Sequence, residues 1–164
     1  MTDQASNRST DQATDNAGIQ FPPPFIYIIP LVLGILAEHW WPLVILPVWL
    51  RMVLGGLSLA ISLGILITGA YELRRNKTAI VPHDPATVLV ESGIYSRTRN
   101  PLYLGLIFFY LGFAFLFSSL WAIILLPDVI FVIQRFVIAK EEAYLERRFG
   151  EAYLEYKQRV GRWF

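Results

Sequence analysis

The chain has 164 residues, of which 55% are hydrophobic and 16% are charged, and its formal net charge at pH 7 is +1. Soluble domains average about 25% charged residues, so this composition predicts a single domain whose solvent is lipid. The near-neutral charge gives no support for nucleic-acid binding. The lack of cysteine excludes disulfides, thiolate metal ligands and a cysteine nucleophile. Two isolated histidines offer no metal-ligand set, so no metal is expected.

The first part of the chain changes from polar to apolar. Residues 1–20 have no apolar period, which predicts a disordered tail and no cleavable signal peptide. The apolar run that follows, about residues 21–39, predicts the first membrane span, with Glu38–Trp41 in the far interface. His39 is interpreted there as a structural neighbour of tryptophan, with a role as ligand or base as the alternative.

The second span is predicted over about residues 50–71, where Met52–Tyr71 carries no charge until Glu72. Gly56, Ala60 and Gly64 recur every four residues within it. Such a spacing predicts a small-residue face for close helix packing, and a face that admits a bulky lipid is the alternative.

A polar loop over residues 72–100 precedes the last two spans, predicted at about 101–117 and 120–139. The two residues Ser118–Ser119 join these spans, so they must form an antiparallel hairpin. Asp128 interrupts the fourth span. An ionisable residue inside a span is a functional candidate by default, and the alternative is a carboxylate paired with another helix or wetted from outside.

The C-terminal segment 140–164 returns to charge, and its apolar residues recur at helical spacing. This pattern predicts an amphipathic helix that lies on the bilayer after a break at Gly150. The residues of the apolar stripe are Phe149, Tyr153, Tyr156 and Val160.

The fold class predicted from these segments is all-α: a polytopic membrane protein with four spans and a C-terminal amphipathic helix. Lysine and arginine concentrate in the loop 72–100 and after Ala139. The positive-inside rule therefore places this loop and both termini in the cytoplasm.

The hairpin brings two cytoplasmic polar segments, 78–103 and 135–156, to one membrane face. Arg97, Arg99 and Asn100 would form one wall of a pocket, and the pair Glu141–Glu142 the other. Such a pocket could hold a charged, water-soluble cofactor while a lipid enters between helices. The alternative is that the basic residues bind anionic headgroups and the acids balance them. No dinucleotide-binding, P-loop or nucleophile-elbow motif is present in the sequence.

Two parts of the sequence resemble a known family. The first joins Leu89–Tyr95 to Arg99–Gly105, and the second joins Glu141–Glu142 to Phe149–Val160. In this order, flanking a helical hairpin, they resemble the isoprenylcysteine carboxyl methyltransferase family, with the phospholipid N-methyltransferases as more distant relatives. Asn100 stands where the eukaryotic enzymes have histidine, and this resembles the bacterial members.

The resemblance implies a membrane methyltransferase that uses S-adenosylmethionine without a Rossmann domain. It implies that the cytosolic loop and the C-terminal segment enclose the cofactor. The positions that it assigns to cofactor binding are Thr87, Val88, Leu89, Val90, Tyr95, Arg99, Asn100, Pro101, Leu102, Tyr103 and Glu141. The positions that it assigns to catalysis are Glu142, beside Glu141, and Arg135, near the family's substrate-contacting basic residues.

Three functions stay open at this point. The first is O-methylation of a lipophilic, isoprenylcysteine-type carboxylate, which needs no base because the acceptor is already ionised. The second is N-methylation of a phospholipid amine, which must first lose a proton to a base. The third is a non-catalytic protein that binds membrane lipids or a partner. The expected location is the bacterial inner membrane, with the active site in the cytoplasm.

Overall fold

The computed structural model describes residues 22–43, 46–78 and 86–164, and the regular elements within these ranges are all helices. The all-α prediction is confirmed for this part of the chain, whereas the predicted tail 1–20 lies outside it. The elements are α2 (Pro23–Trp40), α3 (Val48–Arg75), the 3-10 helix η1 (Gly93–Ser96), α4 (Pro101–Leu116), α5 (Leu120–Val132), the π-helix η2 (Ile133–Ile138), α6 (Ala139–Phe149) and α7 (Glu151–Arg159).

Three helices of the described chain are long and apolar enough to cross a membrane: α2, α3 and the continuous helix Leu120–Phe149. The apolar helix α4 has only 16 residues, or about 24 Å at 1.5 Å per residue, against a hydrocarbon thickness of about 30 Å. Large apolar side chains cover the outer surfaces; Leu33 is 57% exposed and Leu63 is 60% exposed. Such a surface suits a lipid solvent.

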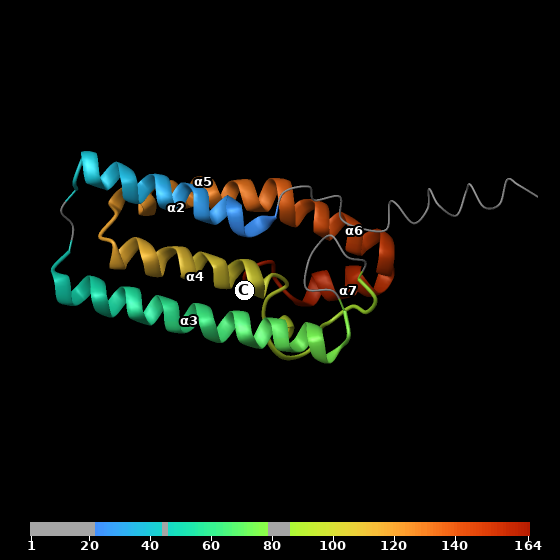
Figure 1. Cartoon of the computed structure of the whole chain (residues 1–164). Coiled ribbons are helices and arrows are strands. Elements are labelled where there is room, and N and C mark those ends of the chain that lie inside the picture. The colour runs from blue at the N-terminus through green and yellow to red at the C-terminus, as the bar shows by residue number, and fades with distance from the viewer. Residues whose placement is uncertain (1–21, 44–45, 79–85) are drawn as a thin grey trace, which may run out of the picture.

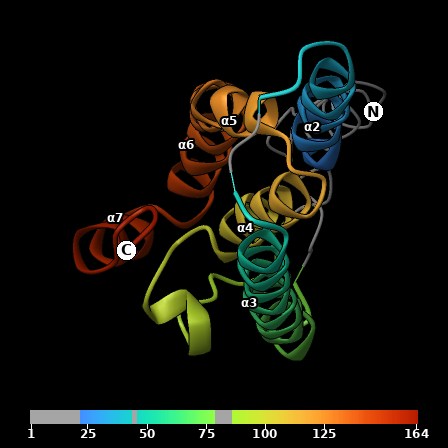
Figure 2. The same cartoon turned by 90° about the vertical axis from the view of Figure 1, so that its left-hand side faces the viewer.

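The long helices form two layers with α4 between them. In Figures 1 and 2, α2 and α5 run side by side on one flank of α4, and α3 runs along the other. The α4–α5 connection is a tight turn in which the Ser119 hydroxyl accepts a hydrogen bond from the Ala122 N–H at 3.1 Å. At the same end, the Glu38 carboxylate accepts from the Leu120 N–H at 2.9 Å. The predicted hairpin is confirmed.

Small residues let α3 and α4 approach closely, but they are not the predicted ones. The Ser62 hydroxyl donates to the Gly105 carbonyl at 2.8 Å. A Cβ on Gly55 would lie 2.7 Å from the Leu116 side chain, whereas one on Gly56 would meet nothing within 4 Å. The packing face repeats every seven residues, and the predicted face with Gly56 and Gly64 was wrong. We call this contact the α3–α4 seam; its small residues are Gly55, Ser62, Gly69, Gly105 and Gly112.

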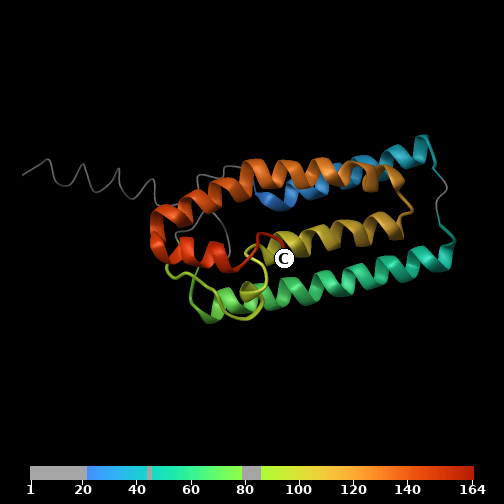
Figure 3. The same ribbon diagram turned by 180° about the vertical axis from the view of Figure 1, so that it is seen from behind.

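The C-terminal helices fold back toward the start of α4. Gly150 has φ +54°, in the left-handed region that favours glycine, and it separates α6 from α7 as predicted. Figure 3 shows α7 returning beneath α6 toward the loop that precedes α4. The apolar stripe on α7 faces the protein: Tyr153 is 1% exposed and Tyr156 is 3% exposed. These two rings pack within the chain, where the sequence pattern had predicted contact with the bilayer.

Candidate functional site

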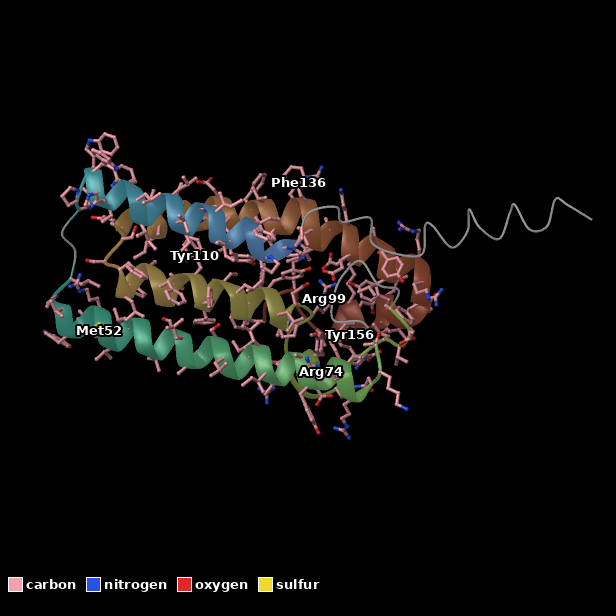
Figure 4. All side chains as sticks on the ribbon, in the orientation of Figure 1. Met52, Arg74, Arg99, Tyr110, Phe136 and Tyr156 are labelled. Atoms are coloured by element: carbon pink, nitrogen blue, oxygen red, sulfur yellow. The ribbon has the colours of Figure 1, made fainter. Side chains whose placement is uncertain are left out.

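A cavity of about 600 Å³ lies where the loop before α4 meets α6 and α7. We call it the end pocket. Its volume is typical of small-molecule sites. Its walls come from the start of α2, the end of α3, the loop with η1, the start of α4, α6 and α7. Figure 4 shows Arg99 and Tyr156 at this end, with Met52 at the opposite end of the helices.

The first wall is the segment that leads into α4. Pro101 begins this helix, where its missing N–H costs nothing. The Arg99 N–H donates to the Gly161 carbonyl at 3.0 Å. The Asn100 amide Nδ2 and the Thr98 hydroxyl both donate to the Arg162 carbonyl at 3.1 Å. Because Nδ2 of Asn100 is used in this way, the orientation of its side-chain amide is fixed.

The opposite wall carries the acidic pair of α6. The Tyr103 hydroxyl, in the first turn of α4, donates to Glu141 Oε2 at 2.8 Å. The Tyr103 carbonyl in turn accepts from the Tyr27 hydroxyl of α2 at 3.2 Å. Tyr103 and Glu141 both line the end pocket. The sequence-distant segments are therefore brought together, as the predicted hairpin requires.

Glu142 is held by two arginines. Arg162 makes two contacts, from Nε to Oε1 at 3.1 Å and from Nη2 to Oε2 at 2.6 Å. Arg99 contacts Oε1 through Nη1 alone, at 3.2 Å. The hydrogen bond to Glu142 raises the pKa of Arg162, so this guanidinium stays charged. The side chains of Arg99 and Glu142 are each 9% exposed, and Arg99 Nε is buried with no hydrogen-bond partner among the described residues.

Three tyrosines line the same pocket outside the long helices. Burial raises the pKa of Tyr153 to about 12, with the Glu142 charge adding to the shift and the Arg99 charge opposing it. Burial also raises the pKa values of Tyr95 and Tyr156 above the ordinary phenol value. The Tyr156 hydroxyl donates to the Tyr95 carbonyl at 2.7 Å, which ties α7 to η1. At neutral pH these phenols are protonated, so they can donate hydrogen bonds but cannot act as bases.

Another part of the pocket lining is apolar. Its residues come from α2 and its N-cap, from α3 and from α4: Pro22, Pro23, Pro24, Leu66, Ala70, Leu73, Leu102 and Leu106. Helix α3 packs on α4 and η1, whereas α2 packs on α4 and α5. The cavity thus joins a charged end to an apolar wall on helices whose outer surfaces are apolar. Among the described residues, no group of three or more His, Cys, Asp or Glu side chains is placed to hold a metal ion.

The sequence profile of the family described as phospholipid methyltransferase matches residues 50–152. The chain belongs to this family. It is 38% identical over 77 residues to the protein-S-isoprenylcysteine O-methyltransferase of Saccharomyces cerevisiae, covering 45% of this chain and 31% of that protein. The enzyme of the same name from Schizosaccharomyces pombe is 34% identical over 73 residues, covering 44% of this chain and 31% of that protein.

A shorter match, 59% identical over 34 residues, joins the chain to an uncharacterized protein of Haemophilus influenzae; it covers 21% of this chain and 54% of that protein. The chain spans only about a third of the length of the two yeast enzymes. Membership of the phospholipid methyltransferase family confirms that the protein belongs to a methyltransferase family, as predicted. The two yeast relatives support the resemblance on which that prediction was based.

Most of the residues that the sequence analysis assigned to the site line the end pocket. They are Val88, Leu89, Val90, Tyr95, Arg99, Asn100, Pro101, Leu102, Tyr103, Glu141 and Glu142. Thr87 does not line it, because its N–H and hydroxyl bond to Thr78 and Lys77. Arg135 does not line it either, since its side chain is exposed on η2. The catalytic role predicted for Arg135 therefore has no geometric support.

The resemblance implied that the C-terminal segment encloses the cofactor, but sequence reasoning missed the apolar wall and the individual C-terminal residues that contribute to the site. The stripe with Tyr153 and Tyr156 was visible in the sequence but was assigned to the bilayer. Tyr144 was missed altogether; it lines the pocket, and its hydroxyl accepts from the Ala86 N–H at 3.0 Å. No local pattern marks Arg162, whose importance comes from its contact with Glu142.

Proposed function

We propose that the protein is an integral membrane methyltransferase that uses S-adenosylmethionine to methylate a lipophilic acceptor. The observation that carries the proposal is the end pocket, which combines an unpartnered buried guanidinium nitrogen, a carboxylate and an apolar wall. Membership of the phospholipid methyltransferase family supports the reaction class. The names of the two yeast relatives support an isoprenylcysteine-type carboxylate as the first candidate acceptor.

The residues of the pocket fit the cofactor. The cofactor's amino-acid part carries a carboxylate and an ammonium group, and its ribose carries hydroxyls. Arg99 Nε is a charged donor suited to the carboxylate. Glu141 is an acceptor suited to the ammonium or to the ribose hydroxyls, and Tyr103 holds it in place. When bound, the cofactor supplies an electrophilic methyl group on a sulfonium.

The contribution of the protein is orientation and the exclusion of water. Displacement at a methyl group requires the donor and the acceptor in line, so a rigid pocket accounts for much of the rate enhancement. The buried rings of Tyr95, Tyr153 and Tyr156 would exclude water from one side of the pocket. The apolar wall with Ala70 and Leu106 offers a surface for the acceptor's hydrocarbon tail.

A carboxylate acceptor needs no base, and the neutral phenols of the pocket offer none. The second candidate is a phospholipid amine, favoured by the description of the matched family. That acceptor must lose a proton, and Glu141 is the pocket carboxylate that is not held by arginine. The two candidates thus assign different work to Glu141.

The topology proposal is four spans, with the fourth supplied by the short helix α4. Exposed basic side chains occur at the end of α3 and beside η1, in the segments that contribute to the pocket: Arg74, Arg75, Lys77 and Arg97. Figure 4 shows Arg74 at this end. The positive-inside rule then places the end pocket and both termini in the cytoplasm of a bacterial cell. On this proposal residues 21–164 form one methyltransferase domain. Labelling of single cysteines at Ser96 and Trp40 in intact cells would test this orientation, since the natural chain has no cysteine.

The deciding experiment is binding followed by transfer. Calorimetry on the protein in detergent should show S-adenosylmethionine binding with a micromolar dissociation constant. This corresponds to a binding free energy on the order of 8 kcal/mol. It should then move a labelled methyl group to a prenylated cysteine analogue in preference to phosphatidylethanolamine in vesicles. Transfer to phosphatidylethanolamine alone would establish the second candidate. Absence of cofactor binding in folded protein would favour a lipid- or partner-binding role and refute the methyltransferase proposal.

A further inference from the structure

Arg162 does not line the end pocket, although it contacts Glu142, which does. Its guanidinium binds both oxygens of Glu142, at 3.1 Å and 2.6 Å. Its backbone carbonyl accepts hydrogen bonds from Thr98 and Asn100. It follows the family match, which ends at residue 152. Arg162 therefore joins the two polar walls of the site without being placed to touch a ligand.

The grip of Arg162 on Glu142 limits what Arg99 can do. A guanidinium and a carboxylate prefer a bidentate pair with two parallel hydrogen bonds. Arg162 already takes that geometry on Glu142, so Arg99 reaches one oxygen through Nη1 alone. The consequence is the buried Arg99 Nε–H without a partner among the described residues. An unsatisfied charged donor at a pocket wall is costly unless a ligand completes it.

The side chain of Arg162 is 35% exposed, whereas those of Glu142 and Arg99 are each 9% exposed. Without the Arg162 side chain, Glu142 Oε2 would lose its ion-pair partner. Arg99 could then turn its fork to both oxygens of Glu142 and use the Nε–H that has no partner here. The Arg162 substitution need not disturb the backbone bonds to Thr98 and Asn100, because they use the main-chain carbonyl.

We propose that Arg162 is a positioning residue: by holding Glu142 bidentately, it keeps Arg99 Nε free to bind a carboxylate of the ligand. The assignment of that carboxylate to S-adenosylmethionine rests on the proposed function. Arg162 acts through Glu142 and Arg99, so its effect must disappear when Glu142 can no longer form the ion pair.

A double-mutant cycle with calorimetry on the full-length protein in detergent tests this dependence. Arg162→Ala should weaken S-adenosylmethionine binding by about tenfold or more, the value of one charge-assisted hydrogen bond. In a Glu142→Gln background the same change should alter the dissociation constant by less than about twofold. Arg162→Lys should restore part of the affinity, because lysine keeps the charge but not the fork. An equal loss in both backgrounds would show a general structural role and overturn the proposal.

Arg159→Ala is the matched control. Arg159 is the last residue of α7 and pairs with Glu91 at 2.5 Å, with its side chain 63% exposed. An exposed pair contributes little, so this variant should bind the cofactor as the wild type does. A tenfold loss in Arg159→Ala as well would mean that any disturbance of this segment weakens binding, which would also overturn the proposal.

A ligand-free measurement separates this inference from the proposed function. In protein labelled with ¹⁵N-arginine, the Arg99 Nε–H signal can be assigned by its loss in Arg99→Lys. It should exchange with water faster in the wild type than in Arg162→Ala, where Glu142 takes up the bond. Wild-type protein that fails to bind S-adenosylmethionine would refute the proposed function alone. Identical Nε–H exchange in the two proteins would refute the role of Arg162 alone.

Discussion

The α3–α4 seam and the end pocket lie on the same helix, α4, but they depend on different physics. In the seam, glycines and Ser62 bring two helices so close that an added Cβ would meet the facing side chains. In the end pocket, ion pairs fix the charged groups beside a cavity. Steric fit determines the packing of the seam, and charge determines the arrangement of the pocket. Substitutions in the seam should therefore change stability, and those in the pocket should change binding.

The largest expected effect comes from the pocket. Glu141→Ala removes the carboxylate that accepts from Tyr103 and faces the cavity. Cofactor affinity should fall by at least about a hundredfold, because the pocket loses the acceptor that Tyr103 holds in place. Calorimetry in detergent measures the dissociation constant. Glu146→Ala is the control on the same helix, since its exposed carboxylate only pairs with Lys157. Wild-type affinity in Glu141→Ala would remove this carboxylate from the site.

The next effect tests the seam. Gly55→Val should destabilise the protein by about 1–3 kcal/mol, the usual cost of overpacking. A Cβ there meets Leu116 at 2.7 Å and the Gly112 carbonyl at 3.0 Å. Gly56→Val, at the adjacent residue, faces open space and should leave the midpoint of thermal unfolding nearly unchanged. Equal shifts in the two variants would contradict the seven-residue repeat of the seam. They would mean that Gly56 packs as closely as Gly55.

The smallest effect is expected where the two regions meet. Ala70 is on α3 and contributes to the apolar wall of the pocket. Ala70→Phe should lower kcat/KM for a long-tailed acceptor by about tenfold, since the added ring occupies apolar space. Cofactor affinity should stay within about twofold of the wild type, because the charged end is untouched.

The control for this change is Ile67→Phe, less than one turn away on α3. Ile67 is 59% exposed on the outer surface of this helix. It should leave both quantities unchanged. A similar loss in both variants would mean that α3 senses bulk in general, and the apolar wall would not be the path of the tail.

Much of the site was predictable because the family motifs occur in short runs with fixed spacing. Arg99, Asn100 and Tyr103 lie within one such run, and Glu141 lies in the other. Thr87 and Arg135 were predicted for the site but do not line the end pocket. Arg135 lies in the π-helix η2. Its wider turn rotates the side chains after it relative to those before it, compared with a regular α-helix. An ordinary helical spacing cannot anticipate that change.

The sequence alone determined the helices, the hairpin turn and the side of the membrane expected for the basic residues. These follow from hydropathy, from a connection of two residues and from charge, all of which are local properties. The tertiary structure decided which glycines meet across the seam, that Tyr153 and Tyr156 face inward, and that Arg162 shares Glu142 with Arg99. Each of these depends on how a helix is rotated against partners distant in the chain. Periodicity shows that a helix has a face, but the neighbours decide what that face meets.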